Sequence, residues 1–226
     1  MDNNLIKLYR TKKTDYESVK ESCEFYLPNV NDVDISIIIP VMNRESFHHP
    51  LVEHLRKAMA NFPSKTYAIT FVEHSSIPKH KSLSRISNAN YIWIKKTDSQ
   101  PFNKCLAMNV GSLYSNKCEY YLFHDIDLLM DKNYFRDIFE NLKRVNSKCA
   151  LQTFAHRRIL VMNQDLSNKI LNHHINLEDL QPGINPPHSN PGAPGGSIFI
   201  HSLSFKQVGG YDPEFFHSYS PEDAFF

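Results

Sequence analysis

Two aspartates separated by one residue stand at the end of an apolar stretch. Asp125 and Asp127 follow residues 120–123, which predict a buried strand. In an extended chain, residues i and i+2 point to the same side, so we expect both carboxylates to project together. Carboxylate oxygens are hard ligands that suit Mg²⁺ or Mn²⁺. A D-x-D tripeptide is also common in solvated turns and helix caps, and its place at a strand end is what favours a metal site.

The elements that must position these carboxylates alternate along the chain. Strand patterns are followed by helix patterns, and ligands of such open sheets bind beyond the carboxyl ends of the strands. The pattern predicts an α/β fold with a mostly parallel central sheet flanked by helices. We expect strands at 35–39, 67–72, 91–94, 120–123, 150–155 and 197–200, and helices at 50–61, 102–114 and 134–145.

Proline and glycine are dense between residues 172 and 196. This density predicts a long irregular loop. Loops of this length in a compact domain are usually functional, and this one is a candidate lid over a bound ligand.

Composition narrows the classes of partner. The 226 residues carry 25 Lys and Arg against 24 Asp and Glu, so the net charge of +1 gives no reason to expect nucleic acid or an anionic membrane as partner. The four cysteines lack zinc-site spacing and are expected to be free thiols. No secretory signal and no apolar stretch of bilayer length is evident. We expect a cytoplasmic protein, which could also sit peripherally at the inner face of a membrane.

Several short segments occur in an order that resembles a known enzyme family. They are residues 37–44, 102–111 and 123–128, then Gly195-Gly196-Ser197, residues 209–213 and Glu222-Asp223. This order resembles the β-1,4-galactosyltransferase family and related nucleotide-sugar glycosyltransferases of the GT-A fold, and suggests a bacterial member. The resemblance covers residues 35–226, which implies an N-terminal extension at 1–34, a nucleotide-binding half at about 35–130 and an acceptor half at about 131–226.

The resemblance implies a UDP-sugar site built from two segments. Pro40, Asn43 and Arg44 match a loop that holds the nucleotide, with Arg44 at the diphosphate or uridine, a role that suits the guanidinium fork. Phe102 matches a residue near the uracil, and Lys104 replaces an arginine near the phosphates.

The same resemblance implies a metal and a place for the donor sugar. Asp125 matches a nucleotide-sugar contact and Asp127 a direct ligand of Mn²⁺ or Mg²⁺. Gly195 and Gly196 match a glycine pair where the backbone approaches the sugar, because a side chain there would fill its space.

The acceptor side is implied by the last residues of the sequence. Glu222 matches an acceptor-sugar ligand, and Asp223 the base that takes the proton of the attacking hydroxyl. Tyr219 falls where the family has a tryptophan that stacks on sugars. After Pro221, Glu222 and Asp223 are also typical of a helix N-terminus, a role that is compatible with catalysis because a carboxylate stays ionised there.

Three departures from the family bear on this reading. Met42 stands where the family has a second arginine, and residues 217–221 replace a tryptophan- and glycine-rich run. The histidine that completes the metal shell in the family has no counterpart before the sequence ends. Either the chain is truncated, or the third ligand comes from elsewhere, with His188, His201 and His217 as candidates.

The sequence therefore predicts a metal-dependent enzyme that transfers a sugar, galactose or N-acetylgalactosamine, from a UDP-sugar to a saccharide or glycoconjugate hydroxyl with inversion. Two alternatives stay open. One is another enzyme on the same fold, either a retaining transferase or a nucleotidyltransferase. The other is a truncated, non-catalytic module that binds UDP.

Overall fold

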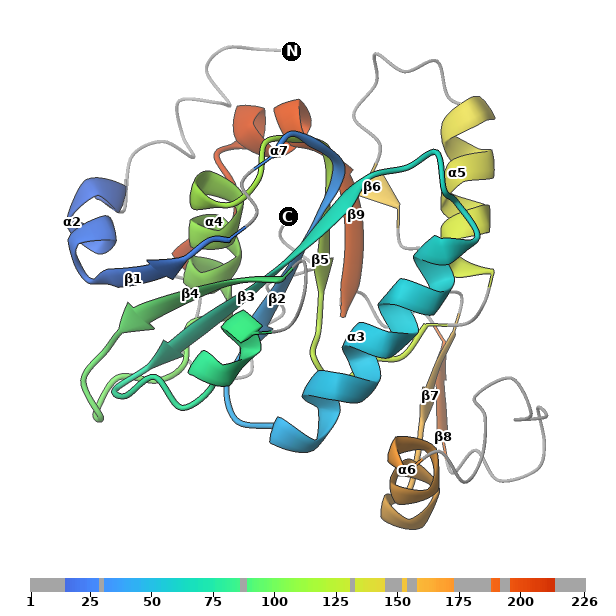
Figure 1. Cartoon of the computed structure of the whole chain (residues 1–226), viewed down its shortest axis with the longest axis horizontal. Helices are drawn as coiled ribbons and strands as arrows, with labels where there is room; N and C mark the ends of the chain where they lie inside the picture. The colour runs from blue at the N-terminus through green and yellow to red at the C-terminus, as the bar shows by residue number, and fades with distance from the viewer. Residues whose placement is uncertain are drawn as a thin grey trace.

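A seven-stranded mixed sheet forms the centre of the structure, a computed structural model (Figure 1). The model describes residues 15–28, 31–85, 89–130, 133–144, 152–153, 158–172, 188–191 and 196–213. In spatial order the sheet holds β1 (Cys23–Tyr26), β4 (Ala89–Lys95), β3 (Tyr67–Ser75), β2 (Val33–Val41), β5 (Cys118–His124), β9 (Ser197–His201) and β6 (Gln152–Thr153). The central strands β4, β3, β2 and β5 are parallel, whereas β1 and β9 run antiparallel to their neighbours.

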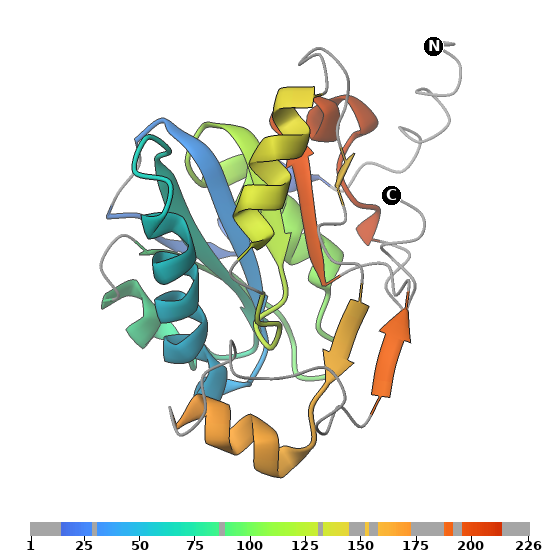
Figure 2. The ribbon, with the colours of Figure 1, turned by 90° about the vertical axis from the view of Figure 1, so that its right-hand side faces the viewer.

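Helices cover both faces of this sheet (Figures 1 and 2). One face packs α3 (Glu45–Ala60) and α5 (Tyr134–Arg144) on side chains such as Ile37 and Phe71. The other packs α4 (Lys104–Tyr114) and α7 (Ser202–Val208) on side chains such as Ile38 and Phe123. The remaining helices are α2 (Tyr16–Glu21), the 3₁₀ helix η1 (Lys81–Arg85) and α6 (Gln164–Leu171), which lies beside a two-stranded ribbon of β7 (Arg158–Val161) and β8 (His188–Pro191).

The chain order changes direction between β2 and β5. From β2 the chain crosses through α3 to β3 on one side, and β5, which follows β4 and α4, pairs with β2 on the other. The β2–β5 pairing extends to Ile38 and Phe123, whereas the β2–β3 pairing continues to Val41 and Glu73. Open α/β sheets bind ligands in the crevice at such a switch point, beyond the carboxyl ends of the strands.

The predicted strands and helices in the centre of the chain are confirmed, with differences at their ends. The strand predicted to end before Pro40 continues through Val41, and its helix begins at Glu45 rather than Pro50. Asn43 and Arg44 adopt left-handed φ angles of 59° and 70°, and α3 begins directly after this turn. The strand predicted at 150–155 is described only at Gln152–Thr153.

The segment predicted as an N-terminal extension contributes to the same sheet. Cys23–Tyr26 form the edge strand β1, in register with Tyr91–Ile94 of β4. Tyr16, Val19 and Phe25 pack against the core that α4 covers. The division of the chain at residue 34 itself stays a prediction.

Two expectations about the whole chain concern membranes and thiols. None of the helices in the described ranges is both long and apolar enough to cross a bilayer. Cys23, Cys105 and Cys118 are free thiols, as expected from their spacing, and Cys149 lies outside the described residues.

Candidate functional site

Two ion pairs mark the carboxyl edge of the sheet at the switch point. Nε of Arg44, after β2, lies 3.5 Å from Oδ2 of Asp127, after β5. Nζ of Lys104, the first residue of α4, lies 3.0 Å and 3.2 Å from the two carboxylate oxygens of Asp125. The structure thus brings together four of the predicted site residues, which come from three separate segments.

The two aspartates do not lie in an extended chain. β5 ends at His124, and Ile126 and Asp127 form a turn in which the Leu128 amide donates to the Asp125 carbonyl at 3.3 Å. Ile126 is buried in the core beneath α3 and α5. Each carboxylate pairs with a different basic side chain, and the expectation that the two aspartates lie in an extended chain is wrong.

The two ion pairs differ in their solvent exposure. The Arg44 and Asp127 side chains are 58% and 43% exposed, whereas Lys104 is only 14% exposed. Exposed pairs contribute little to stability, so the outer pair can open for a ligand at small cost. Asp125 and Lys104 form the firmer inner part of the site.

A buried hydrogen-bond relay holds the turn that carries both aspartates. Nε2 of His124 lies 2.9 Å from the Leu128 carbonyl and Nδ1 lies 3.0 Å from Oγ of Ser197, which also contacts the Tyr134 hydroxyl. A carbonyl only accepts, so Nε2 carries the ring proton and Nδ1 accepts from Ser197. Complete burial lowers the pKa of His124 to about 4, which agrees with a neutral ring.

A glycine closes the other side of this turn. The Asp125 amide donates to the Gly196 carbonyl at 2.7 Å. Gly196 has φ of 76°, and a Cβ on it would lie 3.2 Å from Cδ2 of Leu128. A side chain there would be strained and crowded, as expected of a glycine beside a site. Gly195 lies outside the described residues.

The N-terminus of α4 is tied to two other segments through Asn103. Its Oδ1 accepts from the Leu106 amide at 2.8 Å and caps the helix. Its own amide donates to Nδ1 of His74 at 2.9 Å, and its Nδ2 donates to the Pro213 carbonyl at 2.9 Å. Phe102 is half-buried, with its ring centroid 6.2 Å from that of His74. These contacts fix the helix end from which Lys104 reaches Asp125.

Asn109 and Gly111, in the same segment, have structural roles. Asn109 Nδ2 donates to the Tyr211 carbonyl at 2.7 Å and lies 2.6 Å from the Tyr16 hydroxyl, and its Oδ1 accepts from the Tyr211 amide at 2.9 Å. A Cβ on Gly111 would lie 2.5 Å from Cγ2 of Ile38, so only glycine lets α4 pack this closely on β2. Asn109 and Gly111 of the segment that resembles the family therefore hold α4 in position and, among the residues that the structure describes, have no direct contact with the site.

The donor set at the edge suits a divalent cation that also binds a ligand. Asp125 and Asp127 offer hard oxygens, and in the part of the chain that the structure describes no group of three His, Cys, Asp or Glu side chains could hold a metal by itself. Arg44 and Lys104 balance the two carboxylates, so the cluster has no net positive charge to offer an anion. Mg²⁺ and Mn²⁺ sites that take few protein ligands and several ligand oxygens fit this arrangement.

The other predicted site residues fall into two groups. Pro40 is the second-last residue of β2. His201 caps α7 through the Leu203 amide at 3.2 Å. The predicted acceptor residues Tyr219 and Glu222, and the proposed base Asp223, lie outside the described residues. The third-ligand candidate His217 and the side chain of His188 lie outside them as well.

Sequence reasoning missed the buried residues that hold the backbone of this site through hydrogen bonds. His124, His74 and Ser197 hold the two key turns but were not singled out. For His124 the signal was its place directly before the D-x-D. His74 and Ser197 act through contacts that are distant in sequence, which spacing alone does not reveal.

Comparison with known proteins establishes the fold. No family model matches this sequence, and no curated protein matches it. The structure is similar to S. aureus TarS residues 1–349, with a TM-score of 0.52, 14% identity and coverage of 84% of this chain and 53% of TarS.

Two ligand complexes are similar to the same degree. A mutant Drosophila β1,4-galactosyltransferase 7 with manganese, UDP-Gal and xylobiose has a TM-score of 0.50 and 15% identity, covering 87% of this chain and 59% of that one. The TarS fragment with UDP-GlcNAc has a TM-score of 0.50 and 14% identity, covering 84% and 51%. The chain thus spans between half and three fifths of these structures, and it has the GT-A fold of nucleotide-sugar transferases, as predicted.

Proposed function

We propose that the chain is a metal-dependent glycosyltransferase that takes a hexose from a UDP-sugar and transfers it, with inversion, to a saccharide hydroxyl. The observation that carries the proposal is the meeting of Arg44–Asp127 and Lys104–Asp125 at the switch point of the sheet. Mixed cationic and acidic groups at this edge suit a nucleoside diphosphate together with a divalent cation. The similar structures that contain UDP-Gal or UDP-GlcNAc support this ligand class.

The side chains divide the work of holding the donor. Arg44 is 58% exposed, so it can leave Asp127 at small cost and pair with a phosphate through its planar fork. Lys104 is fixed beside Asp125 and contributes a compact positive charge near the phosphates. The half-buried Phe102 ring next to His74 offers an apolar surface for the uracil. Gly196 lies beside the Asp125 turn, where the resemblance places the donor sugar.

Asp125 and Asp127 would hold the cation at this edge. When bound, Mn²⁺ or Mg²⁺ neutralises the diphosphate and stabilises it as a leaving group. The proposed base Asp223, with Glu222 and Tyr219 for the acceptor, would complete the reaction by taking the proton of the attacking hydroxyl. A galactose or N-acetylgalactosamine donor follows the resemblance to β-1,4-galactosyltransferases.

The first test measures UDP affinity by calorimetry with and without Mn²⁺. We expect Mn²⁺ to strengthen binding, Asp127→Asn to abolish that gain, and Arg44→Ala to weaken binding about tenfold or more, as for loss of a charged hydrogen bond. Asp98→Asn, at an exposed aspartate after β4, is the matched control and should leave binding unchanged. If the UDP affinity of the wild type were the same with and without Mn²⁺, the proposed metal site would be wrong.

The second test measures the chemistry. Incubation with UDP-galactose, UDP-N-acetylgalactosamine or UDP-N-acetylglucosamine and a saccharide acceptor should give a glycoside whose anomeric configuration, read by NMR, is inverted. A retained configuration would point to the retaining alternative. UDP binding without transfer or hydrolysis would favour a non-catalytic module, and pyrophosphate release from a nucleoside triphosphate would favour a nucleotidyltransferase.

A further inference from the structure

Each aspartate of the proposed metal site already has a basic partner within the chain. Arg44 pairs with Asp127 across 3.5 Å, and Lys104 pairs with both oxygens of Asp125 at 3.0 Å and 3.2 Å. Two positive charges thus balance the two carboxylates without any ligand. A divalent cation that arrives alone must displace a basic side chain to reach a carboxylate, and this competition weakens its binding.

The two pairs differ in how easily they exchange partners. Lys104 is largely buried and belongs to the first turn of α4, which Asn103 caps. Arg44 is the residue before α3, and its side chain makes no capping hydrogen bond to that helix. Both Arg44 and Asp127 are exposed to solvent, so their separation costs little. Asp127 is therefore the carboxylate that can change from one partner to another.

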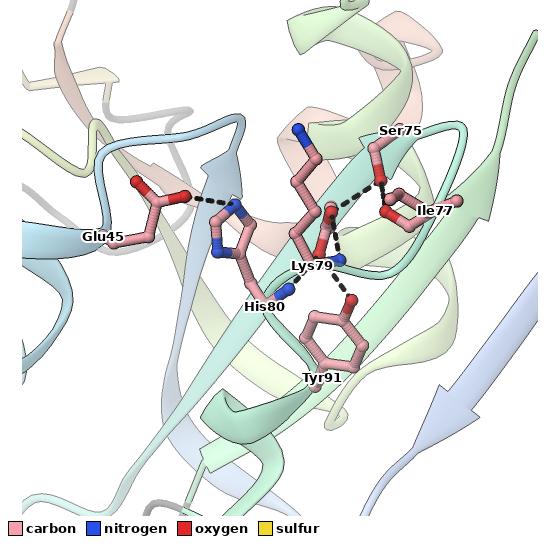
Figure 3. Close-up of polar contacts among 7 residues, drawn as sticks. Glu45, Ser75, Ile77, Lys79, His80 and Tyr91 are labelled. Carbon is pink, nitrogen blue, oxygen red and sulfur yellow. Dashed lines mark hydrogen bonds and ion pairs between the residues drawn. The ribbon is translucent and has the colours of Figure 1, made fainter. Parts of the chain in front are cut away.

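The acid that follows Arg44 in the sequence lies toward a different group. Glu45 is the first residue of α3, and its Oε1 lies 3.9 Å from Nε2 of the buried His80 (Figure 3). Within the described ranges, the ion pair of Arg44 is therefore with Asp127 and not with its neighbour in the sequence. The competition for Arg44 concerns the carboxylate that the proposed function assigns to the cation.

Another exposed cation, Lys79, stands at the same edge of the sheet but outside both pairs. It lies in the loop after β3, a strand parallel to β2. The amides of Lys79 and His80 donate to the buried Glu73 carboxylate at 3.1 Å and 2.9 Å, and the Tyr91 hydroxyl donates to it at 2.6 Å (Figure 3). These bonds hold the backbone of the loop firmly. In the part of the chain that the structure describes, the Lys79 ammonium pairs with neither aspartate of the site.

We infer that Arg44 holds Asp127 until a diphosphate draws it away, so that nucleotide and cation bind interdependently. The diphosphate offers oxygens to the guanidinium, Arg44 leaves Asp127, and the freed carboxylate becomes available to the cation. Such coupling is reciprocal: UDP strengthens cation binding by the same factor as the cation strengthens UDP binding. The inference rests on the proposed function for its two ligands, and it adds that Arg44 opposes the cation when the nucleotide is absent.

The test measures Mn²⁺ binding without nucleotide, from the electron paramagnetic resonance signal of free Mn²⁺. Arg44→Gln keeps a long polar side chain and removes the charge that competes for Asp127. We expect this variant to bind Mn²⁺ alone about two- to fivefold more tightly than the wild type, as for loss of an exposed ion pair. The factor by which Mn²⁺ strengthens UDP binding, measured by calorimetry, should become smaller by the same amount. Arg44→Lys keeps the charge and should stay close to the wild type in both values.

Lys79→Gln is the matched control, because it removes an exposed charge at the same edge of the sheet. It should change neither value. Unchanged or weaker binding of Mn²⁺ alone by Arg44→Gln would overturn the inference, and so would an equal gain in Lys79→Gln, which indicates a general effect of charge. Either result leaves the proposed function intact if the wild type binds UDP more tightly with Mn²⁺.

Two further outcomes separate the inference from the proposed function. If Arg44→Gln binds Mn²⁺ alone more tightly and its coupling to UDP decreases, but the wild type transfers no sugar, the inference is supported and the proposed transferase activity is wrong. A wild type that binds UDP and Mn²⁺ independently of each other would contradict both.

Discussion

At the scale of single residues, the buried histidines act as neutral hydrogen-bonding groups. His124 holds the D-x-D turn through both ring nitrogens, and His74 accepts from the amide of Asn103 at the start of α4. Both have a pKa of about 4, because burial disfavours the charged ring. Part of the histidine content of the sequence therefore stabilises the two turns of the site, which is a role independent of metal.

The neutral state of His74 predicts a dependence of stability on pH. Burial, assisted by Lys96, lowers its pKa from 6.5 to about 4, so the unfolded chain binds the proton more readily. Stability is then complete above pH 6.5 and decreases as the pH falls toward 4. We expect the free energy of unfolding to drop by about 1–2 kcal/mol between pH 7 and pH 5 from this group. Urea unfolding at several pH values measures it.

His74→Asn is the variant that separates this effect from other titrating groups. Its Oδ1 can still accept from the Asn103 amide, but the side chain does not titrate. The variant should lose that part of the pH dependence while it remains folded at pH 7. A pH profile identical to that of the wild type would show that His74 is not the group responsible.

At the scale of elements, the close packing of α4 on the sheet sets where Lys104 stands. A Cβ on Gly111 would lie 2.5 Å from Cγ2 of Ile38 and 3.0 Å from Cγ2 of Val72. We therefore expect Gly111→Ala to destabilise the protein by about 2 kcal/mol, because overpacking exceeds the gain in helix propensity. Thermal unfolding checks this, with Leu113→Ala, at a half-exposed position of the same helix, as the control of small effect. A stabilised Gly111→Ala would show that the helix can shift away from β2.

Elements with one strong local signal could be predicted from the sequence. β2 and β5 are runs of apolar residues bounded by polar ones, and their alternation with helical segments indicated the parallel sheet. The strand β1 has only four residues and acquires its conformation by pairing with β4, so it has no clear pattern of its own. Local propensity is a weak guide for such edge strands.

The candidate site was predictable in its residues but not in its geometry. Asp125 and Asp127 were identified from their spacing at a strand end, Arg44 and Lys104 through the resemblance, and the structure brings the four together in two ion pairs. Their pairing depends on the turn after β5 and on the left-handed turn before α3, which are held by contacts between residues far apart in sequence. Spacing alone cannot reveal such contacts, and for this reason the extended D-x-D step was expected wrongly.

At the scale of the whole molecule, the site edge is linked to the segment that leads toward the proposed acceptor residues. Asn103 and Asn109 bind the backbone of Pro213 and Tyr211, just before residue 214. The helix that presents Lys104 to Asp125 therefore also anchors the start of the last part of the chain. If the chain is the transferase proposed above, its donor and acceptor groups must be held in one geometry, and α4 anchors residues 211–213, which precede the proposed acceptor residues in the sequence.

The N-terminal segment, which includes the edge strand β1, also packs against α4. Phe25 of β1 packs against Tyr114 of α4, with ring centroids 5.5 Å apart, and the Tyr16 hydroxyl bonds Asn109. If residues before 34 were a dispensable extension, changes there would not affect the fold. We expect Phe25→Ala to lower the free energy of unfolding by about 2–3 kcal/mol, toward the lower end for a half-buried aromatic residue.

Chemical denaturation measures this loss, and Glu24→Gln, on the exposed side of the same strand, is the control. Because Phe25 lies on the face that α4 covers, its removal should also loosen the helix that carries Lys104, and UDP affinity should fall in proportion to the loss of order rather than disappear. Full stability in Phe25→Ala would mean that β1 is a passive edge and that the folded unit begins at β2.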